Sequence, residues 1–189
     1  VGVNRPLRHQ VLTITQDVYR WYSNVNAVQP TTALAAENTA YSGAAWTTVY
    51  RLRLNLLLGG ATLPASSQAF KVQYATSTSG PWSDVGAIGS AEVWRGYNNS
   101  TPADGAGITG LLLSTSNVLE TYEEQNPTPS NPNGINAGQR GEWDWALQHN
   151  GAASNTIYYF RVAKSDGTVL DAYTRYAQLA TATLTFDQN

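Results

Sequence analysis

Tyr50-Arg51-Leu52-Arg53-Leu54-Asn55-Leu56 is the stretch that decides the fold, because apolar and polar side chains alternate strictly along it. A period of two places the leucines on one face of an extended strand and the polar residues on the other. One face then packs in a core and the other meets water, which is typical of an antiparallel sheet with one wet side. The stretch therefore predicts a half-buried β-strand.

The same alternation recurs along the chain, in residues 12–18, 70–74, 142–148, 158–162 and 183–187. Turn-forming pairs such as Gly59-Gly60, Asn150-Gly151 and Asp166-Gly167 separate these stretches. We therefore expect an all-β protein, an antiparallel β-sandwich of roughly eight to ten strands. Residues 110–123 are ambiguous between a short helix and a bent strand.

The length of 189 residues suits one large domain. We expect residues 11–189 to form a single β-sandwich domain, preceded by an N-terminal arm, residues 1–10, that serves as an extension strand. The sequence contains no Met, which we interpret as a mature form whose leader has been removed. It contains no Cys either, which excludes disulfides and Cys-ligated metals.

Charge is sparse, since only 13% of the residues are charged and 11 basic residues face 13 acidic ones. Lys71 and Lys164 are the only lysines, and no stretch gathers a basic face. Nucleic acid needs such a face, so we expect no nucleic-acid partner. No apolar run approaches the roughly 18 residues of a membrane-spanning helix, so we expect no direct membrane insertion.

Two resemblances support this architecture. The stretch Ile157-Tyr158-Tyr159-Phe160-Arg161-Val162 resembles the F strand of fibronectin type III and related immunoglobulin-like sandwiches. Several motifs also resemble a β-rich domain that recurs in secreted and surface proteins of environmental bacteria and archaea, with no catalytic activity attached to it. These motifs are Tyr19-Arg20-Trp21, residues 34–39, residues 70–76, residues 80–85, residues 141–144 and residues 164–168. The resemblance implies an immunoglobulin-like sandwich and an extracellular or cell-surface location.

The carboxylates Glu142 and Asp144 flank Trp143 on one strand face. Paired carboxylates serve glycoside hydrolysis, but the period-two pattern favours a solvated strand face. His9 and His149 lie in no metal-ligand or triad spacing. We therefore expect no catalytic residues, no cofactor and no metal site. Asp-bearing loops at Asp104 and at residues 166–171 leave calcium open as an alternative to ordinary turns.

Two surface features concern glycans. Trp82 and Trp94 lie near turn-rich segments and are the candidate platform on which a sugar ring would stack. Asn98 and Asn99 begin two overlapping N-glycosylation acceptor patterns.

The N-terminal segment carries the functional hypothesis. It has little turn chemistry and runs into the alternating stretch, so it predicts a strand that a neighbouring subunit accepts by β-strand addition. The expected assembly residues are Val1, Val3, Leu7, Val11, Leu12 and Ile14. We therefore expect a non-enzymatic structural subunit of an extracellular, pilus-like filament, whose partners are copies of itself. The alternative is a carbohydrate-binding, adhesive surface module with glycans as partners.

Overall fold

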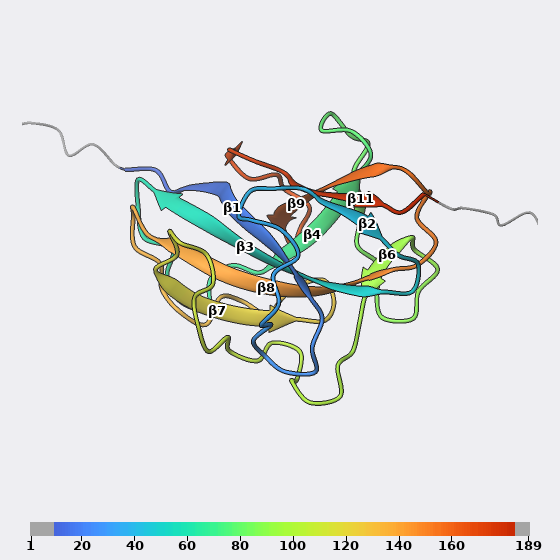
Figure 1. Cartoon of the computed structure of the whole chain (residues 1–189). Helices are drawn as coiled ribbons and strands as arrows, with labels where there is room; N and C mark the ends of the chain where they lie inside the picture. The colour runs from blue at the N-terminus through green and yellow to red at the C-terminus, as the bar shows by residue number, and fades with distance from the viewer. Residues whose placement is uncertain (1–9, 184–189) are drawn as a thin grey trace, which may run out of the picture.

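A computed structural model describes residues 10–183, and this part of the chain is built from β-strands with no helix (Figure 1). The predicted all-β class is confirmed. Eleven strands follow one another: β1 (Thr13–Ser23), β2 (Tyr41–Ala44), β3 (Val49–Gly59), β4 (Phe70–Ala75), β5 (Ser83–Asp84), β6 (Trp94–Gly96), β7 (Val118–Glu123), β8 (Arg140–His149), β9 (Ile157–Lys164), β10 (Ala172–Tyr173) and β11 (Ala177–Thr181).

The strands form two sheets, which we call sheet A and sheet B. Sheet A has the order β10-β1-β3-β8-β6, with β7 also paired to β8, and sheet B has the order β2-β11-β9-β4-β5. Most pairs are antiparallel, but β1 with β10, β2 with β11 and β7 with β8 are parallel. The two-sheet sandwich agrees with the sequence, whereas the expected purely antiparallel, immunoglobulin-like arrangement gives way to two mixed sheets.

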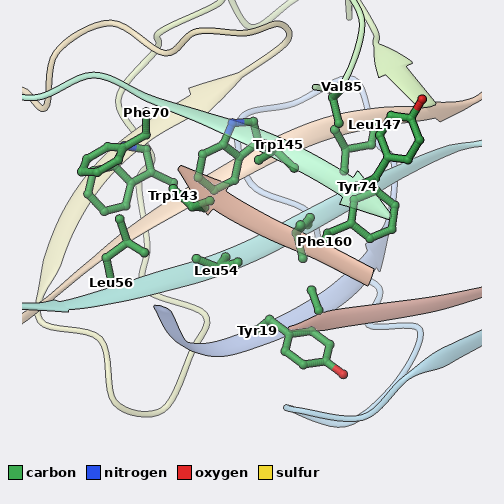
Figure 2. Packing of buried hydrophobic residues seen from close by; sticks show 14 of the residues in the cluster. Tyr19, Leu54, Leu56, Phe70, Tyr74, Val85, Trp143, Trp145, Leu147 and Phe160 are labelled. Carbon is green, nitrogen blue, oxygen red and sulfur yellow. The ribbon is translucent and has the colours of Figure 1, made fainter. Parts of the chain in front are cut away.

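The core lies between the sheets and is rich in aromatic rings (Figure 2). β3 contributes Leu52, Leu54 and Leu56, and β8 contributes Trp143 and Trp145, all of them fully buried. Each such side chain stabilises the fold by about 1.5–3 kcal/mol relative to an exposed one. The alternation in these two strands therefore assigns the core face correctly.

Edge-to-face ring contacts join the two sheets. Phe70 of β4 packs against Trp143 with the ring centroids 5.2 Å apart and the planes at 73°. Trp94 of β6 packs against Phe160 of β9 at the same centroid separation, with the planes at 82°. This geometry places the positive edge of one ring on the negative face of the next.

The second face of β3 and β8 is buried as well, contrary to the expectation of a wet face. Arg51, Arg53 and Asn55 are all fully buried, although they alternate with the core leucines. The loops at residues 24–29 and 105–117 cover this face of sheet A, and β7 extends the sheet beside β8. The ambiguous segment 110–123 contains no helix. Residues 110–117 belong to the second covering loop, and residues 118–123 form β7.

The described chain begins and ends at opposite ends of the sandwich (Figure 1). At the end where the chain enters, β1 begins beside the end of β3, because Thr13 pairs with Gly59. At the far end lie the turn between β2 and β3, the loop between β8 and β9, and the end of β11.

Candidate functional site

The most highly charged group of side chains is an ion-pair network on the outer face of sheet A. Arg51 grips Asp144 with two hydrogen bonds, from Nε to Oδ1 at 2.9 Å and from Nη2 to Oδ2 at 2.8 Å. Arg53 donates from Nε to Asp144 Oδ2 at 2.7 Å and from Nη1 to Glu142 Oε1 at 2.8 Å. All four side chains are completely buried. The prediction that Glu142 and Asp144 lie on a solvated face is therefore wrong.

Arg51 also holds one covering loop on the sheet. Its guanidinium donates to the carbonyl oxygens of Ala27 at 2.9 Å and Val28 at 2.6 Å. It also lies 4.3 Å from the ring centroid of Tyr122 on β7, within cation–π range.

Glu142 and Arg53 hold the second covering loop. The Glu142 carboxylate accepts hydrogen bonds from the backbone N–H groups of Leu112 and Leu113, and Arg53 donates to the carbonyl of Gly110 at 3.0 Å. Because arginines and backbone amides saturate both carboxylates, neither is available to act as a general acid or base. The network is a structural clamp for the covering loops.

β7 carries two buried carboxyl groups, Glu120 and Glu123, whose burial the sequence does not indicate. Neither oxygen of Glu120 or of Glu123 has a hydrogen-bond partner of good geometry among residues 10–183. Burial raises the pKa of Glu120 to about 8, and burial likewise raises the pKa of Glu123 to about 8. Both groups are therefore largely protonated near neutral pH. The alternating pattern gives no sign of this, because β7 is distorted by a register shift between Leu119 and Tyr122.

The two tryptophans of the expected sugar platform do not lie together on the surface. Trp94 is completely buried in the core, so its assignment to a platform is wrong. The three-residue strand β6 that carries it pairs with β8, which draws the ring between the sheets.

Trp82 is half-buried beside sheet B. Its ring stacks on Tyr176, with the centroids 5.3 Å apart and the planes at 27°, and Tyr176 stacks in turn on Tyr173. The guanidinium of Arg161 lies 4.3 Å from the Trp82 ring centroid. The rings of Trp82, Tyr176 and Tyr173 therefore form a stacked row, and the contacts among them and with Arg161 fix their orientation.

A polar hollow opens beside Trp82, and its lining includes Lys71, Gln73, Asp84 and Glu92. Lys71 Nζ and Gln73 Nε2 both donate to the Asp84 carboxylate, at 2.7 and 2.8 Å. A stacked ring next to an ordered set of polar side chains is a combination that suits sugar hydroxyls.

The two candidate glycosylation residues differ in accessibility. Asn99 is buried, and its side-chain amide donates to Tyr122 Oη at 2.6 Å and to Asn24 Oδ1 at 3.1 Å. A glycan on Asn99 would replace one of the two donated amide hydrogens and would have to fit at a buried position, so the folded chain disfavours it as an acceptor. Asn98 is exposed, with its amide close to Glu124 Oε2.

The Asp-bearing loops are explained by hydrogen bonds within the chain. Asp166 Oδ1 accepts from the N–H of Thr168 at 2.8 Å, which is an Asx-type turn. Asp104 Oδ1 accepts from the N–H of Glu124 at 2.6 Å. Residues 10–183 contain no group of three or more His, Cys, Asp or Glu side chains that could hold a metal ion.

The far end of the sandwich has an apolar hollow of about 240 Å³. Trp46, in the turn between β2 and β3, forms part of its lining and is 66% exposed. His149, at the end of β8, also lines it, and burial lowers the pKa of this imidazole. Ile157, at the start of β9, is 50% exposed at this end of the molecule. Sequence reasoning missed this hollow because three separate loops build it.

The end at which the chain enters also exposes apolar side chains. Val11 is 73% exposed, whereas Leu12 packs against the core and Ile14 is buried within it. Val169 is 51% exposed in the loop after β9, and this loop joins β1 through the bond from Asp171 N–H to the Ile14 carbonyl.

Ile14 therefore belongs to the core of its own subunit. The expected assembly residues Val1, Val3 and Leu7 lie outside the described residues, as does His9.

Comparisons of this chain with known proteins identify no relative. No family model, no curated protein and no solved structure gives a significant match to this chain. The described residues contain no helix that is both long and apolar enough to cross a membrane.

Proposed function

We propose that this protein is a structural subunit of an extracellular filament that assembles head to tail. The observation that carries the proposal is the pair of unlike apolar ends. Val11 and Val169 are exposed where the chain enters, and Trp46 and Ile157 are exposed at the far end, beside an apolar hollow. In the proposed contact, the far end of one subunit covers the end of the next subunit at which its chain enters. A dimer joined in this way still has one uncovered end of each kind, so further subunits can add.

Symmetry makes such a contact propagate. Two different surfaces that bind each other form a heterologous interface, which generates a ring or an open filament. Contact surfaces of this kind are depleted in charged residues at their centres. The exposed apolar side chains at both ends, in a chain with only 13% charged residues, fit that description.

The N-terminal arm is the proposed connector. β-strand addition supplies backbone hydrogen bonds for affinity and alternate side chains for register. Because Ile14 is part of its own subunit's core, the exchanged part of the arm ends before Thr13, where β1 begins. The resemblance to surface-protein domains supports an extracellular location.

The test is size-exclusion chromatography and negative-stain electron microscopy of the full chain, followed by a Trp46→Ser variant. We expect filaments from the wild type and a shift toward monomers in the variant, with its thermal stability unchanged because the side chain is mostly exposed. Leu111→Ser is the matched control, since Leu111 is 39% exposed but lies on the loop that covers sheet A. A monomeric wild type would refute the proposal.

A second candidate function is glycan binding at Trp82, which the polar hollow beside this ring favours. Aromatic stacking would orient the sugar, and the side chains of Gln73 and Asp84 would meet its hydroxyls. A glycan array with the wild type and with Trp82→Ala tests it. Binding that the substitution abolishes supports this function, and an array without any binding removes it.

A further inference from the structure

We propose that the hollow between Trp46 and His149 receives an apolar side chain from residues 1–9 of a second copy of this chain. The inference rests on the proposed head-to-tail assembly and assigns its receiving site. It therefore names both the surface and the segment that fills it.

The hollow has the chemistry of a side-chain socket. Small residues line it, with Trp46 and His149 as the large ones and no charged side chain among them: Ala44, Gly151, Ala152, Ser154 and Ala182. Sites for small molecules span roughly 300–1,000 Å³ and contain a few polar groups that orient the ligand. At about 240 Å³, this hollow is smaller and more apolar. It suits an aliphatic side chain better than a metabolite or a sugar.

The hollow also lies beside a free sheet edge. β2 is the edge strand of sheet B and pairs with β11 alone among the named strands. It ends at Ala44, which is buried and lines the hollow. An extended segment that adds to this edge would deliver alternate side chains toward the hollow, as strand addition requires.

The N-terminal residues fit as the occupant. Val1, Val3, Leu7 and exposed Val11 all stand at odd positions, so an extended chain presents them on one face. Arg5 and His9 share that face, so single apolar side chains, not a continuous apolar strip, are offered to the hollow. Prolines are tolerated in edge strands, which accommodates Pro6.

Length makes the contact intermolecular. Nine extended residues span at most about 32 Å. β3 runs between the two ends of the sandwich, from the turn that carries Trp46 to the start of β1, and its eleven residues span about 36 Å. The arm therefore falls short of its own hollow but reaches that of a neighbour stacked end to end.

Disulfide trapping tests the site directly, because residues 1–189 contain no cysteine. Val3→Cys and Leu7→Cys variants are each mixed with Ala152→Cys under mild oxidation and separated on a non-reducing gel. We expect covalent dimers from at least one mixture. Mixing the same arm variants with Ala103→Cys, on an exposed loop, is the matched control and should give none.

A filling variant provides the second measurement. Ser154 is exposed at the hollow, so Ser154→Trp would block it with little effect on folding, and Ser154→Ala is its control. We expect Ser154→Trp to lose filaments and Ser154→Ala to keep them.

The outcomes separate the two proposals. A monomeric wild type removes the proposed function and this site with it. Filaments that form without any trapped dimer, and that tolerate Ser154→Trp, leave the assembly standing and overturn the site. A disulfide within one chain between Ala152→Cys and Phe186→Cys would also overturn it, because the C-terminal residues would then fill the hollow themselves.

Discussion

Replacing Asp144 by Asn tests the account of the buried clamp on sheet A. The substitution keeps the volume of the side chain and removes the only charge that contacts both Arg51 and Arg53. Three short hydrogen bonds from the two guanidinium groups, at 2.7–2.9 Å, lose their anionic acceptor. Arg53 would keep Glu142 as a carboxylate partner, whereas Arg51 would keep only the backbone carbonyl oxygens of residues 25, 27 and 28 among its partners in the described part of the chain.

The structure indicates a large cost. Removing one partner of a fully buried ion pair costs about 3–5 kcal/mol, because the remaining charge is left uncompensated. The free energy of unfolding of a whole domain is about 5–15 kcal/mol, so the loss is a large fraction of the total. With a urea slope of about 2 kcal/mol per molar, the unfolding midpoint falls by about 2 M.

The assay is equilibrium unfolding in urea, followed by tryptophan fluorescence, with Asp84→Asn as the matched control. Asp84 forms an ion pair with Lys71 of similar length, 2.7 Å, but its side chain is 47% exposed. Exposed pairs contribute about 0–1 kcal/mol, so the control should stay close to the wild type. If Asp144→Asn costs no more than Asp84→Asn, the network does not clamp the loops and the reasoning fails.

Three further predictions concern stability. Glu120 and Glu123 have a pKa of about 8 in the folded chain against an ordinary value of 4.5, so the stability that these two groups contribute is fully present below pH 4.5 and is lost as pH rises toward 8. Urea titrations should therefore give a lower free energy of unfolding at pH 8 than at pH 5, and this difference should shrink in Glu120→Gln and Glu123→Gln. Leu52→Ala should cost about 2–5 kcal/mol in the same assay, and an equal loss in Leu111→Ala would contradict the assignment of the core. Gly96→Ala should destabilise by about 1–3 kcal/mol because its Cβ would collide with the Glu124 carbonyl oxygen, whereas Gly107→Ala, with open space around it, should be close to neutral.

The sequence predicted the strands well because alternation is a local property. The leucines of β3 and the tryptophans of β8 lie in the core, as their spacing indicates. What alternation cannot show is whether a second layer covers the opposite face. The covering loops lie far from β3 in sequence, so burial of Arg51 and Arg53 depends on contacts that no local pattern contains.

One signal could have revealed the clamp. β3 alternates arginine with leucine, and β8 alternates acidic residues with tryptophan, so pairing these strands places opposite charges across from each other. The observed register confirms this match, since Arg53 lies opposite Asp144. Complementary cross-strand charges of this kind would have favoured a paired network over two solvated faces.

For Trp94, too, a side chain that local sequence predicts to be exposed is buried, but for another reason. Its neighbourhood is rich in turn residues, which favours a loop and therefore exposure, but the short strand β6 pairs with β8 and places the ring in the core. Strands of two or three residues carry too little pattern for sequence reasoning to assign a face. The apolar hollow at the far end was missed for a related reason, because residues from β2, β8 and β11 and their flanking loops meet there only in three dimensions.

The placement of the chain's entry and exit at opposite ends of the sandwich has a mechanical consequence. Tension applied between these ends would pull β1 along its own axis against β3, and β11 along its axis against β9. Antiparallel hydrogen bonds lie perpendicular to the strands, so this load would strain many of them at once instead of opening them one by one. Tension between these two ends would therefore load the sandwich in the shear direction of its main strands.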